Sequence, residues 1–515
     1  MDREVFFLLP KHSIFRNALL LTAIDLLLRG ISMSFQIYLS GVIGAAGLGL
    51  LQLVAAVGTL GMTLGLSGVR TAVMYLCAEE YGKRRPGGMR HVMRLCILWS
   101  SVFSILTAAA LWGFSNQLAA VWLKDLRAAS GLRILALSLP VECLVCVLCG
   151  YFTACGKLRR LACVEVAERL VSLALTFLLL RLWAHSELER ACCSLLLGGG
   201  GAAVFSAVWL GLLMRKDLRQ YPPVPQPPQL PRRLCRLCVP LALGDYLRSG
   251  LRTLEQLLIP LGLERSGGST GSAMAAYGTI HAMVFPILMF PAAIIFSLSE
   301  LLIPELARCR AEGNSRRILH LTGRSLRLGP VFACGVSALQ FLLARPLGML
   351  FYQSEEAGHY LRLFAPLIVI LYADALVDGM CKGLGQQTAN VRNNTITSLL
   401  DVALLYLLLP RWGIGGYFFT FVLTHALNFY LSLRLLLDAS GSALPLGPLA
   451  KTALCALASA AACLLLPERG QCLLQILRTC GLFLAAYLPL LYLTGALVPN
   501  DRRWLRRRFP HRNGH

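Results

Sequence analysis

The chain has 515 residues, of which 56% are hydrophobic and only 15% are charged. Soluble domains contain about 25% charged residues, so the composition argues against a water-soluble protein. The net charge of +23 lies in short segments between apolar runs, which argues against nucleic-acid binding and favours topology signals and contact with anionic membrane lipids.

Apolar runs of roughly twenty residues recur along the chain, the length that a helix needs to cross about 30 Å of hydrocarbon. The runs are continuous rather than alternating, which favours helices over a β-barrel. About fourteen spans are predicted, near residues 13–39, 46–75, 91–114, 132–152, 161–183, 191–214, 234–261, 273–302, 326–351, 360–384, 395–409, 416–437, 449–466 and 473–497. The expected fold class is an all-α polytopic membrane protein.

A polar, Pro-rich linker separates the sixth span from the seventh, and its proline density predicts a stiff spacer. The predicted organisation is a six-helix bundle over 1–214, a cytoplasmic linker over 215–233, a second six-helix bundle over 234–438, and two extra helices with a basic tail over 439–515.

Positive charge alternates between the connections. Lys and Arg are concentrated at residues 83–90, 157–160, 215–233, 308–324 and 502–508. The connection at 40–45 carries no charge, and the one at 124–127 is a weak exception with two cations and one acid. Because positive loops stay in the cytoplasm, both termini are predicted to be cytoplasmic, in a multi-pass protein of the cell membrane.

Two parts of the chain resemble each other. Residues 132–183 align without gaps on residues 361–412, a shift of 361 − 132 = 229. The matches pair Arg133 with Arg362, Gly150 with Gly379, Gly156 with Gly385 and Trp183 with Trp412. The copies are six spans apart and so cross in the same direction, which predicts two parallel six-helix bundles with a cavity between them.

Several charged residues fall inside predicted spans, where a charge costs at least about 2.5–3.5 kcal/mol unless it faces a cavity or a partner. The candidate substrate-cavity residues are Asp25, Arg29, Arg70, Asp245, Arg248, Arg252, Glu255, His281, Asp374 and Asp378. Arginine suits bidentate binding of phosphate, so an anionic substrate is predicted. The carboxylates could bind a coupling cation or neutralise the arginines, and paired structural charges or side chains snorkelling from helix ends remain the alternative.

Signatures of other chemistry are absent from the sequence. It contains no GxxxxGK[ST], HExxH or GxSxG motif, and no loop is large enough for a soluble catalytic domain. The 18 Cys lie mostly in apolar runs without the ligand spacing of a zinc site. We therefore expect no enzyme, no cofactor and no metal site. Prolines 286, 291 and 304 predict kinks in the eighth span, and the glycines of the second and sixth spans indicate close packing or hinges.

Three stretches resemble a known family. They are YLSGVIGAAGLGLLQL at 38–53, GLSGVRTAV at 65–73 and FPAAIIFSLSELLIPE at 290–305. They are similar to the stage V sporulation protein B group, in the polysaccharide-transporter branch of the multidrug/oligosaccharidyl-lipid/polysaccharide (MOP) flippase superfamily. The resemblance covers roughly residues 13–500.

This resemblance implies two six-helix bundles, often with two extra helices, that work by alternating access. It implies movement of a polyprenyl-phosphate-linked glycan, such as a cell-wall or spore-cortex precursor, across the cytoplasmic membrane. In related lipid II flippases, cavity arginines lie on spans one, two and eight. Arg29 and Arg70 match the first two positions, whereas the eighth span offers His281 and the further arginines lie on the seventh.

Other functions remain open on the sequence alone. A cation-coupled multidrug exporter of the same fold is the main alternative to the flippase. A membrane-embedded glycosyltransferase or acyltransferase would need an acid/base cluster at one membrane face. A non-transporting scaffold partner of cell-wall or spore-coat proteins would tolerate changes of the cavity charges.

Overall fold

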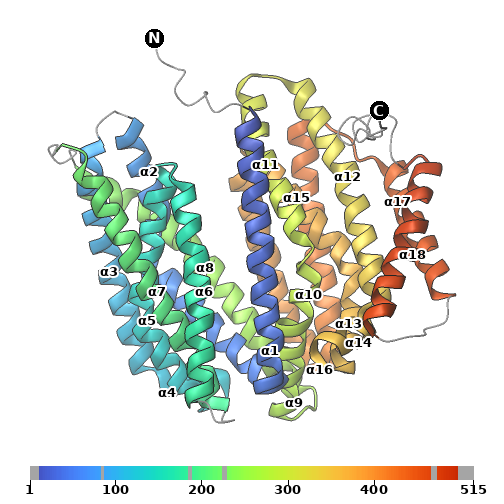
Figure 1. Ribbon diagram of the computed structural model, residues 1–515, viewed down its shortest axis with the longest axis horizontal. Coiled ribbons are helices and arrows are strands. Elements are labelled where there is room, and N and C mark those ends of the chain that lie inside the picture. Colours follow the sequence, from blue (N-terminus) through green and yellow to red (C-terminus); the bar gives the residue numbers. More distant parts are fainter. Residues whose placement is uncertain (1–10, 83–85, 184–187, 223–228, 466–471, 497–515) are drawn as a thin grey trace, which may run out of the picture. The chain divides into compact units, whose positions relative to one another are not determined.

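The computed structural model describes residues 11–82, 86–183, 188–222, 229–465 and 472–496. Within these ranges the secondary structure is helical and contains no strands (Figure 1). In the described part of the chain, ten helical segments are long and apolar enough to cross a membrane, and two of them, α1 and α16, are each two helices joined at a kink. Helices α6 and α8 have spanning length but more charge, which brings the count to fourteen and confirms the predicted fold class.

The first half of the chain, with its connection into the second, forms α1 (Lys11–Leu66), α2 (Val69–Gly82), α3 (Met89–Gly113), α4 (Ser115–Gln117), α5 (Ala128–Ala154), α6 (Leu158–Trp183), α7 (Leu188–Arg219), α8 (Leu230–Arg265) and α9 (Thr270–Gly278). The second half forms α10 (Phe285–Met289), α11 (Ala292–Ala311), α12 (Ser315–Leu342), α13 (Ala344–Tyr352), α14 (Glu355–Phe364), α15 (Ile368–Gly383), α16 (Gln387–Ser440), α17 (Leu446–Leu464) and α18 (Cys472–Leu493). The termini at 1–10 and 497–515, and residues 223–228 of the predicted linker, lie outside the described residues.

The helices group into two compact units. The N-terminal unit comprises Tyr38–Gly278 and Leu405–Gly413, and the C-terminal unit comprises Met1–Ile37, Thr279–Leu404 and Ile414–His515. Helix α8, which begins the second half of the predicted repeat, therefore packs in the N-terminal unit. The predicted bundle boundaries at 214 and 234 describe the repeat in the sequence and remain a prediction. The compact units describe which residues contact one another in the structure.

Small residues bring the helices of the N-terminal unit together. Helix α5 packs against α2, α3 and α7. A Cβ atom added to Gly61 would come within 2.8 Å of Leu139 on α5, and one added to Gly201 would come within 2.9 Å of Leu175 on α6. Glycines 198–201 lie inside the unbroken helix α7. These contacts support the packing interpretation of the glycine-rich spans.

The second span is broken, although one helix over 46–75 is predicted. Helix α1 ends at Leu66, and Ser67 and Gly68 both have positive φ values, of 48° and 73°. A Cβ atom on Gly68 would lie 2.7 Å from the carbonyl oxygen of Cys238 and 2.9 Å from the amide nitrogen of Ala242, both on α8. The break thus lies where α8 approaches closely and requires a glycine, a contact that a hydropathy pattern does not report.

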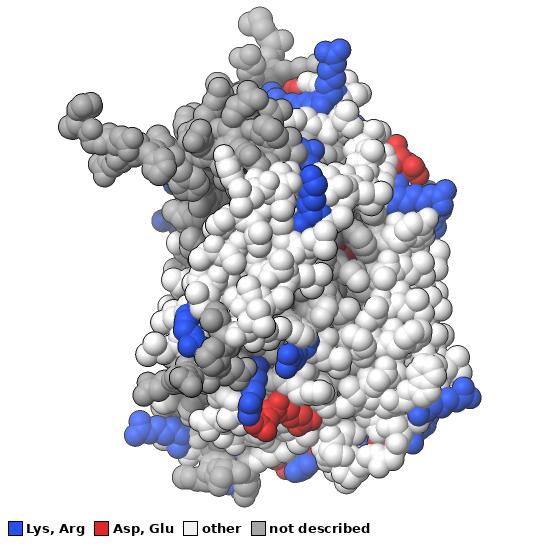
Figure 2. Space-filling model, turned by 90° about the vertical axis from the view of Figure 1, so that its right-hand side faces the viewer, with Lys and Arg blue, Asp and Glu red and all other residues white. Residues whose placement is uncertain are grey.

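The eighth predicted span is irregular near Pro286 and Pro291, whereas Pro304 lies inside helix α11. A π-helical turn, η3, occupies Thr279–Val284 between α9 and α10, and the helix breaks again at Pro291 before α11. In the C-terminal unit, α11 and α12 both pack on α15, and α12 also packs on α17. On the face shown in Figure 2, most charged side chains lie towards the two ends, with a largely uncharged belt between them, as a lipid-facing surface requires.

Backbone conformations support the predicted repeat and extend it. Phe114 and Leu343, 229 residues apart, share φ −92° and ψ 5°. Lys124 and Gln353, again 229 apart, are left-handed with φ 53° and 51°. Helix α5 packs on α2 and α3, and its counterpart α15 packs on α11 and α12, which are six spans further on in each case. The repeated structure therefore begins before residue 132.

Candidate functional site

One face of α8 packs inside the N-terminal unit. The hydroxyl of Tyr246 donates to Ser67 Oγ at 2.7 Å, and Thr253 Oγ1 donates to the carbonyl of Ala56 at 3.4 Å. Both partners belong to the segment 38–68, the second half of α1 and the residues that follow it. These bonds fix the rotation of α8 about its axis.

The charged residues of α8 lie on another face. Arg248 and Arg252 are exposed and one helical turn apart, and Asp245 and Glu255 are half-buried one turn further out on either side. Among the described residues, neither arginine forms an ion pair with a carboxylate. An unpaired arginine in mid-span is costly in lipid, so this face is suited to an aqueous cavity and to an anionic ligand.

Arg70 lies in the first turn of α2, in the same unit, with an exposed side chain. Its carbonyl oxygen lies 3.2 Å from the position of a Cβ atom on Gly150, so this turn packs tightly on α5. Helix α2 packs on α8 in this unit. Arg70 and the arginines of α8 therefore lie on neighbouring helices of the N-terminal unit, each with an exposed side chain.

Arg29 belongs to the C-terminal unit, where its guanidinium carbon lies 5.7 Å from the centre of the Phe296 ring on α11. This distance is within the range of a cation–π interaction. The side chain of Asp25 lies outside the described residues, so the predicted Asp25–Arg29 pair remains a prediction.

His281 lies in the π-helical turn η3 and faces an aromatic cluster. Its Nε2 is 3.2 Å from the hydroxyl of Tyr417, and its ring centre is 5.2 Å from that of Phe285. Phe364 and Phe421 extend the cluster, with ring centres 5.7 and 5.5 Å from Phe285. His281 is therefore surrounded by rings, unlike the exposed arginines of α8.

Asp374 takes part in a hydrogen-bonded network between α15 and both halves of α16. Asn428 Nδ2 donates to Asp374 Oδ2 at 3.1 Å, and Thr397 Oγ1 donates to Asn428 Oδ1 at 3.1 Å. The other carboxylate oxygen, Asp374 Oδ1, is buried and has no hydrogen-bond partner among the described residues. A carboxylate that accepts a hydrogen bond from an amide at one oxygen, and whose other oxygen is buried without a partner, is suited to bind a cation or a water molecule.

Asp378, one turn further along α15, binds different partners. It accepts a hydrogen bond from Asn390 Nδ2 and pairs with Lys382 Nζ at 2.5 Å. Ser432 Oγ in turn donates to Asn390 Oδ1 at 3.0 Å. Asp374 and Asp378 therefore share a helix and a neighbourhood, but each has its own set of partners.

A third carboxylate was not predicted as a cavity residue. Asp401 is only 7% exposed and accepts a hydrogen bond from Thr424 Oγ1 at 2.7 Å. The sequence does carry a signal for this network, because polar side chains recur at helical spacing on both halves of α16. These residues are Asn390, Asn394, Thr397 and Asp401 before the kink, and Thr420, Thr424, Asn428 and Ser432 after it.

The network offers oxygen ligands without a dense acidic cluster. Asn394 Oδ1 and Thr420 Oγ1 are also buried without a partner among the described residues. No group of three His, Cys, Asp or Glu side chains in the described ranges is arranged to hold a metal ion. A bound cation would thus be held by single carboxylates together with amide and hydroxyl oxygens, as suits a hard monovalent cation or a proton.

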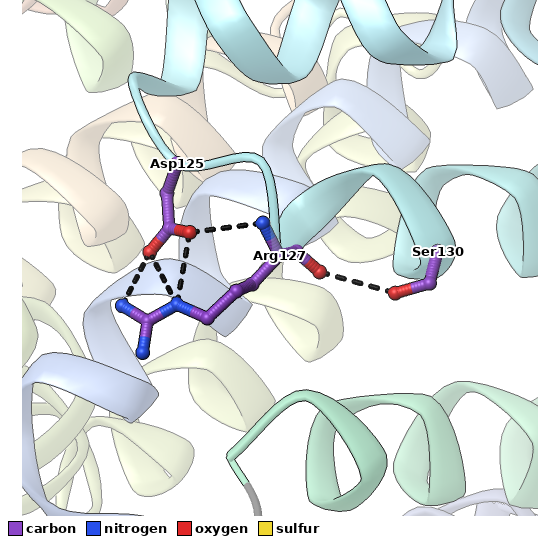
Figure 3. A network of polar contacts seen from close by, with 3 residues as sticks. All are labelled: Asp125, Arg127 and Ser130. Atoms are coloured by element: carbon purple, nitrogen blue, oxygen red, sulfur yellow. Dashed lines mark hydrogen bonds and ion pairs between the residues drawn. The ribbon is translucent and has the colours of Figure 1, made fainter.

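The connection before α5 is held by its own charges (Figure 3). Asp125 accepts hydrogen bonds from the backbone amide of Arg127 at 3.0 Å and from its Nη2 at 2.7 Å, while Ser130 Oγ donates to the Arg127 carbonyl at 3.1 Å. Partial burial alone would raise the pKa of Asp125, but these hydrogen bonds outweigh it and lower that pKa. Lys124 pairs with Glu264, at the end of α8, at 2.5 Å. The charges of this loop are therefore structural.

Comparisons with known proteins agree with this architecture. The MatE family model matches residues 23–178 and 269–407. The chain is 21% identical over 416 residues to stage V sporulation protein B of Bacillus subtilis (strain 168), covering 79% of this chain and 80% of that protein.

Solved structures show the same fold at low sequence identity. A structure described as the lipid II flippase MurJ in an inward closed conformation aligns with a TM-score of 0.71 and 11% identity, over 94% of this chain and 100% of that one. An inward-facing multidrug resistance MATE family transporter of the MOP superfamily aligns with a TM-score of 0.58 and 16% identity, over 80% and 93%. The first of these two structures is of a flippase and the second of a transporter.

Proposed function

The chain belongs to the MatE family, and on that basis we propose that it is a flippase for a lipid-linked oligosaccharide or peptidoglycan precursor. The substrate in this proposal is an anionic polyprenyl-phosphate-linked glycan, moved across the cytoplasmic membrane by alternating access. The similarity to stage V sporulation protein B supports a role in cell-wall or spore-cortex synthesis.

The observation that carries the proposal is the exposed pair Arg248 and Arg252 on α8. Two guanidinium groups one helical turn apart can bind the oxygens of a phosphate or diphosphate in bidentate fashion. A cation-coupled multidrug exporter of the same fold would have to accommodate cationic drugs beside two exposed arginines that form no ion pair among the described residues, which like-charge repulsion disfavours.

We also propose that the α15–α16 network binds a coupling cation. The buried carboxylate of Asp401 and the spare oxygen of Asp374 support this role, since a buried acid with no cationic partner among the described residues gains most from a bound cation. Asp401→Asn should keep the hydrogen bond with Thr424 and therefore the fold. Its expected effect is a lower translocation rate with nearly unchanged thermal stability, and a variant with normal translocation at every sodium concentration and pH would contradict the coupling role.

The decisive experiment is complementation of lipid II translocation in cells depleted of their own flippase. Wild type should rescue growth and translocation, whereas Arg29→Ala and Arg252→Ala should not, at matched membrane expression. Arg252→Lys tests bidentate binding, because lysine keeps the positive charge but lacks the paired N–H donors of the guanidinium group. Arg434→Ala, an exposed arginine near the end of α16, is the matched control and should rescue.

Three other results would redirect the proposal. A well-expressed wild type that never rescues would exclude lipid II and favour another lipid-linked glycan. Rescue by Arg252→Ala would remove the arginine pair from the mechanism. Drug resistance that depends on a cation gradient, without any rescue, would support the exporter.

We further propose that both termini lie in the cytoplasm, as the alternation of positive charge predicts. Fusion of a reporter to the C-terminus tests this orientation. A cytoplasmic terminus should give a fluorescent green fluorescent protein fusion and an inactive alkaline phosphatase fusion, and the reverse pattern would overturn the topology.

A further inference from the structure

Six cations gather where α6 begins and α7 ends. We call Lys157, Arg159, Arg160, Arg215, Lys216 and Arg219 the basic cluster. Its two halves are joined by Asp217, which is only 3% exposed and lies 2.7 Å from Lys157 Nζ and 2.8 Å from Arg160 Nη1. One acid among six cations leaves a strong positive excess at this end of the N-terminal unit.

Asp217 organises the cluster without neutralising it. Both of its carboxylate oxygens are occupied, one by each partner, yet the side chain of Arg160 is still 53% exposed. Arg215, Lys216 and Arg219 are exposed and form no ion pair among the described residues. These three side chains are thus available to an anion outside the protein.

The basic cluster lies at one end of an exposed apolar surface on α7. On α7 the exposed residues Leu197, Val204, Val208 and Leu212 recur at helical spacing, and Arg215 and Arg219 continue the same face. At 1.5 Å per residue, the apolar part extends about 22 Å along the helix. A face that is apolar over most of a bilayer and then becomes cationic places its charges at the level of the lipid head groups.

The end of α7 is also held rigidly. Arg90, at the start of α3, donates to the carbonyl of Leu218 from Nε at 3.2 Å and from Nη2 at 2.6 Å, and Nη2 also donates to the carbonyl of Tyr221 at 3.0 Å. These bonds satisfy carbonyl groups that a helix end leaves without partners. The exposed cations are therefore presented from a fixed backbone and not from a frayed end.

We propose that the basic cluster binds the head groups of anionic phospholipids in the adjoining leaflet and so anchors the N-terminal unit in the membrane. Net positive charge supplies the attraction, and the apolar face of α7 provides the surface for the acyl chains. Each cation near an anionic membrane surface contributes about 1 kcal/mol, which is about fivefold in affinity. This surface lies apart from the arginine face of α8, so the proposal stands whether or not the transported substrate is a lipid-linked glycan.

The test uses the full chain, purified in a neutral detergent and titrated with dioleoyl phosphatidylglycerol or dioleoyl phosphatidylcholine, with bound lipids counted by native mass spectrometry. Wild type should bind phosphatidylglycerol at least about tenfold more tightly than phosphatidylcholine. The triple variant R215Q/K216Q/R219Q should lose most of this preference. Added salt should weaken the preference in wild type and matter less in the variant.

The matched control is R316Q/R392Q/R434Q, which removes three exposed arginines that are scattered over α12 and α16. It should keep the preference for phosphatidylglycerol. Equal loss in both triple variants would show that only net charge matters, and would overturn the site. Full competition by soluble glycerol phosphate would identify a free-anion site instead. Melting temperatures in detergent alone show whether each variant is folded.

Discussion

Gly156 and Gly385 lie 229 residues apart and have the same left-handed φ of +68°. Gly156 follows α5 and lies two residues before the start of α6. Gly385 follows α15 and lies two residues before the start of α16. Their surroundings differ. A Cβ atom on Gly156 would meet no atom within 4 Å, whereas one on Gly385 would clash with the guanidinium group of Arg310.

Gly385→Ala should therefore destabilise the protein more than Gly156→Ala. Both changes force alanine into the left-handed region, at about 1–2 kcal/mol each. Gly385→Ala also displaces Arg310 from the carbonyl of Leu384, adding about 1 kcal/mol. Thermal unfolding in detergent measures the difference, and equal melting temperatures for the two variants would contradict the role of Arg310.

Gly278→Ala should be among the most damaging substitutions of a single small residue. The added Cβ atom would clash with the carbonyl of Ala45 and lie 2.7 Å from the amide nitrogen of Gly49. Both obstacles are backbone atoms that no rotamer change can move, so a loss of about 1–3 kcal/mol or more is expected. Gly271→Ala, with nothing within 4 Å, is the control and should melt close to wild type. The measurement is again thermal unfolding of the purified protein.

Asp217→Asn should destabilise the N-terminal unit by about 1–3 kcal/mol, because a buried carboxylate that binds two cations is replaced by a neutral amide. Glu305→Gln removes a more exposed acid, paired with Arg317, and should cost less than about 1 kcal/mol. Chemical unfolding of the two variants should give clearly separated midpoints. A larger effect at Glu305 would refute the argument from burial.

The pH dependence of the loop before α5 follows from Asp125. Because its pKa is lower in the folded protein than in the unfolded chain, its stabilisation is fully present above the unfolded value of about 4 and disappears as pH falls through the folded value. The gap in melting temperature between wild type and Asp125→Asn should be constant from pH 8 to pH 5. Below pH 4 the gap should shrink. A gap that widened there would show that folding does not lower the pKa of Asp125.

Much of the fold follows from the sequence, because bilayer thickness sets the length of each apolar run. The span predicted over 161–183 is α6 at Leu158–Trp183, and the one over 449–466 is α17 at Leu446–Leu464. The shift of 229 also follows from the sequence alone. The break at Ser67–Gly68 does not, because the α8 backbone that packs against Gly68 is about 170 residues away in the chain.

The candidate site is less predictable than the fold. The spacing of Arg248 and Arg252 indicates a common face, and the structure places both side chains on an exposed one. The partners of Asp374 and Asp378 are amides and a lysine on α15 and α16 rather than arginines. The packing of the helices determines which rows of polar side chains face one another. These rows of polar residues can be seen in the sequence at helical spacing. The row before Gly413 faces the row after it only because α16 is kinked at Gly413.

The kinks at Gly44 and Gly413 have a consequence for biosynthesis. At each, the chain passes from one crossing to the next through a single non-helical residue, with φ values of 69° and 55°. Because no spare chain is left at these points, we expect the two crossings of each pair to enter the membrane together, as one helical hairpin of about forty apolar residues.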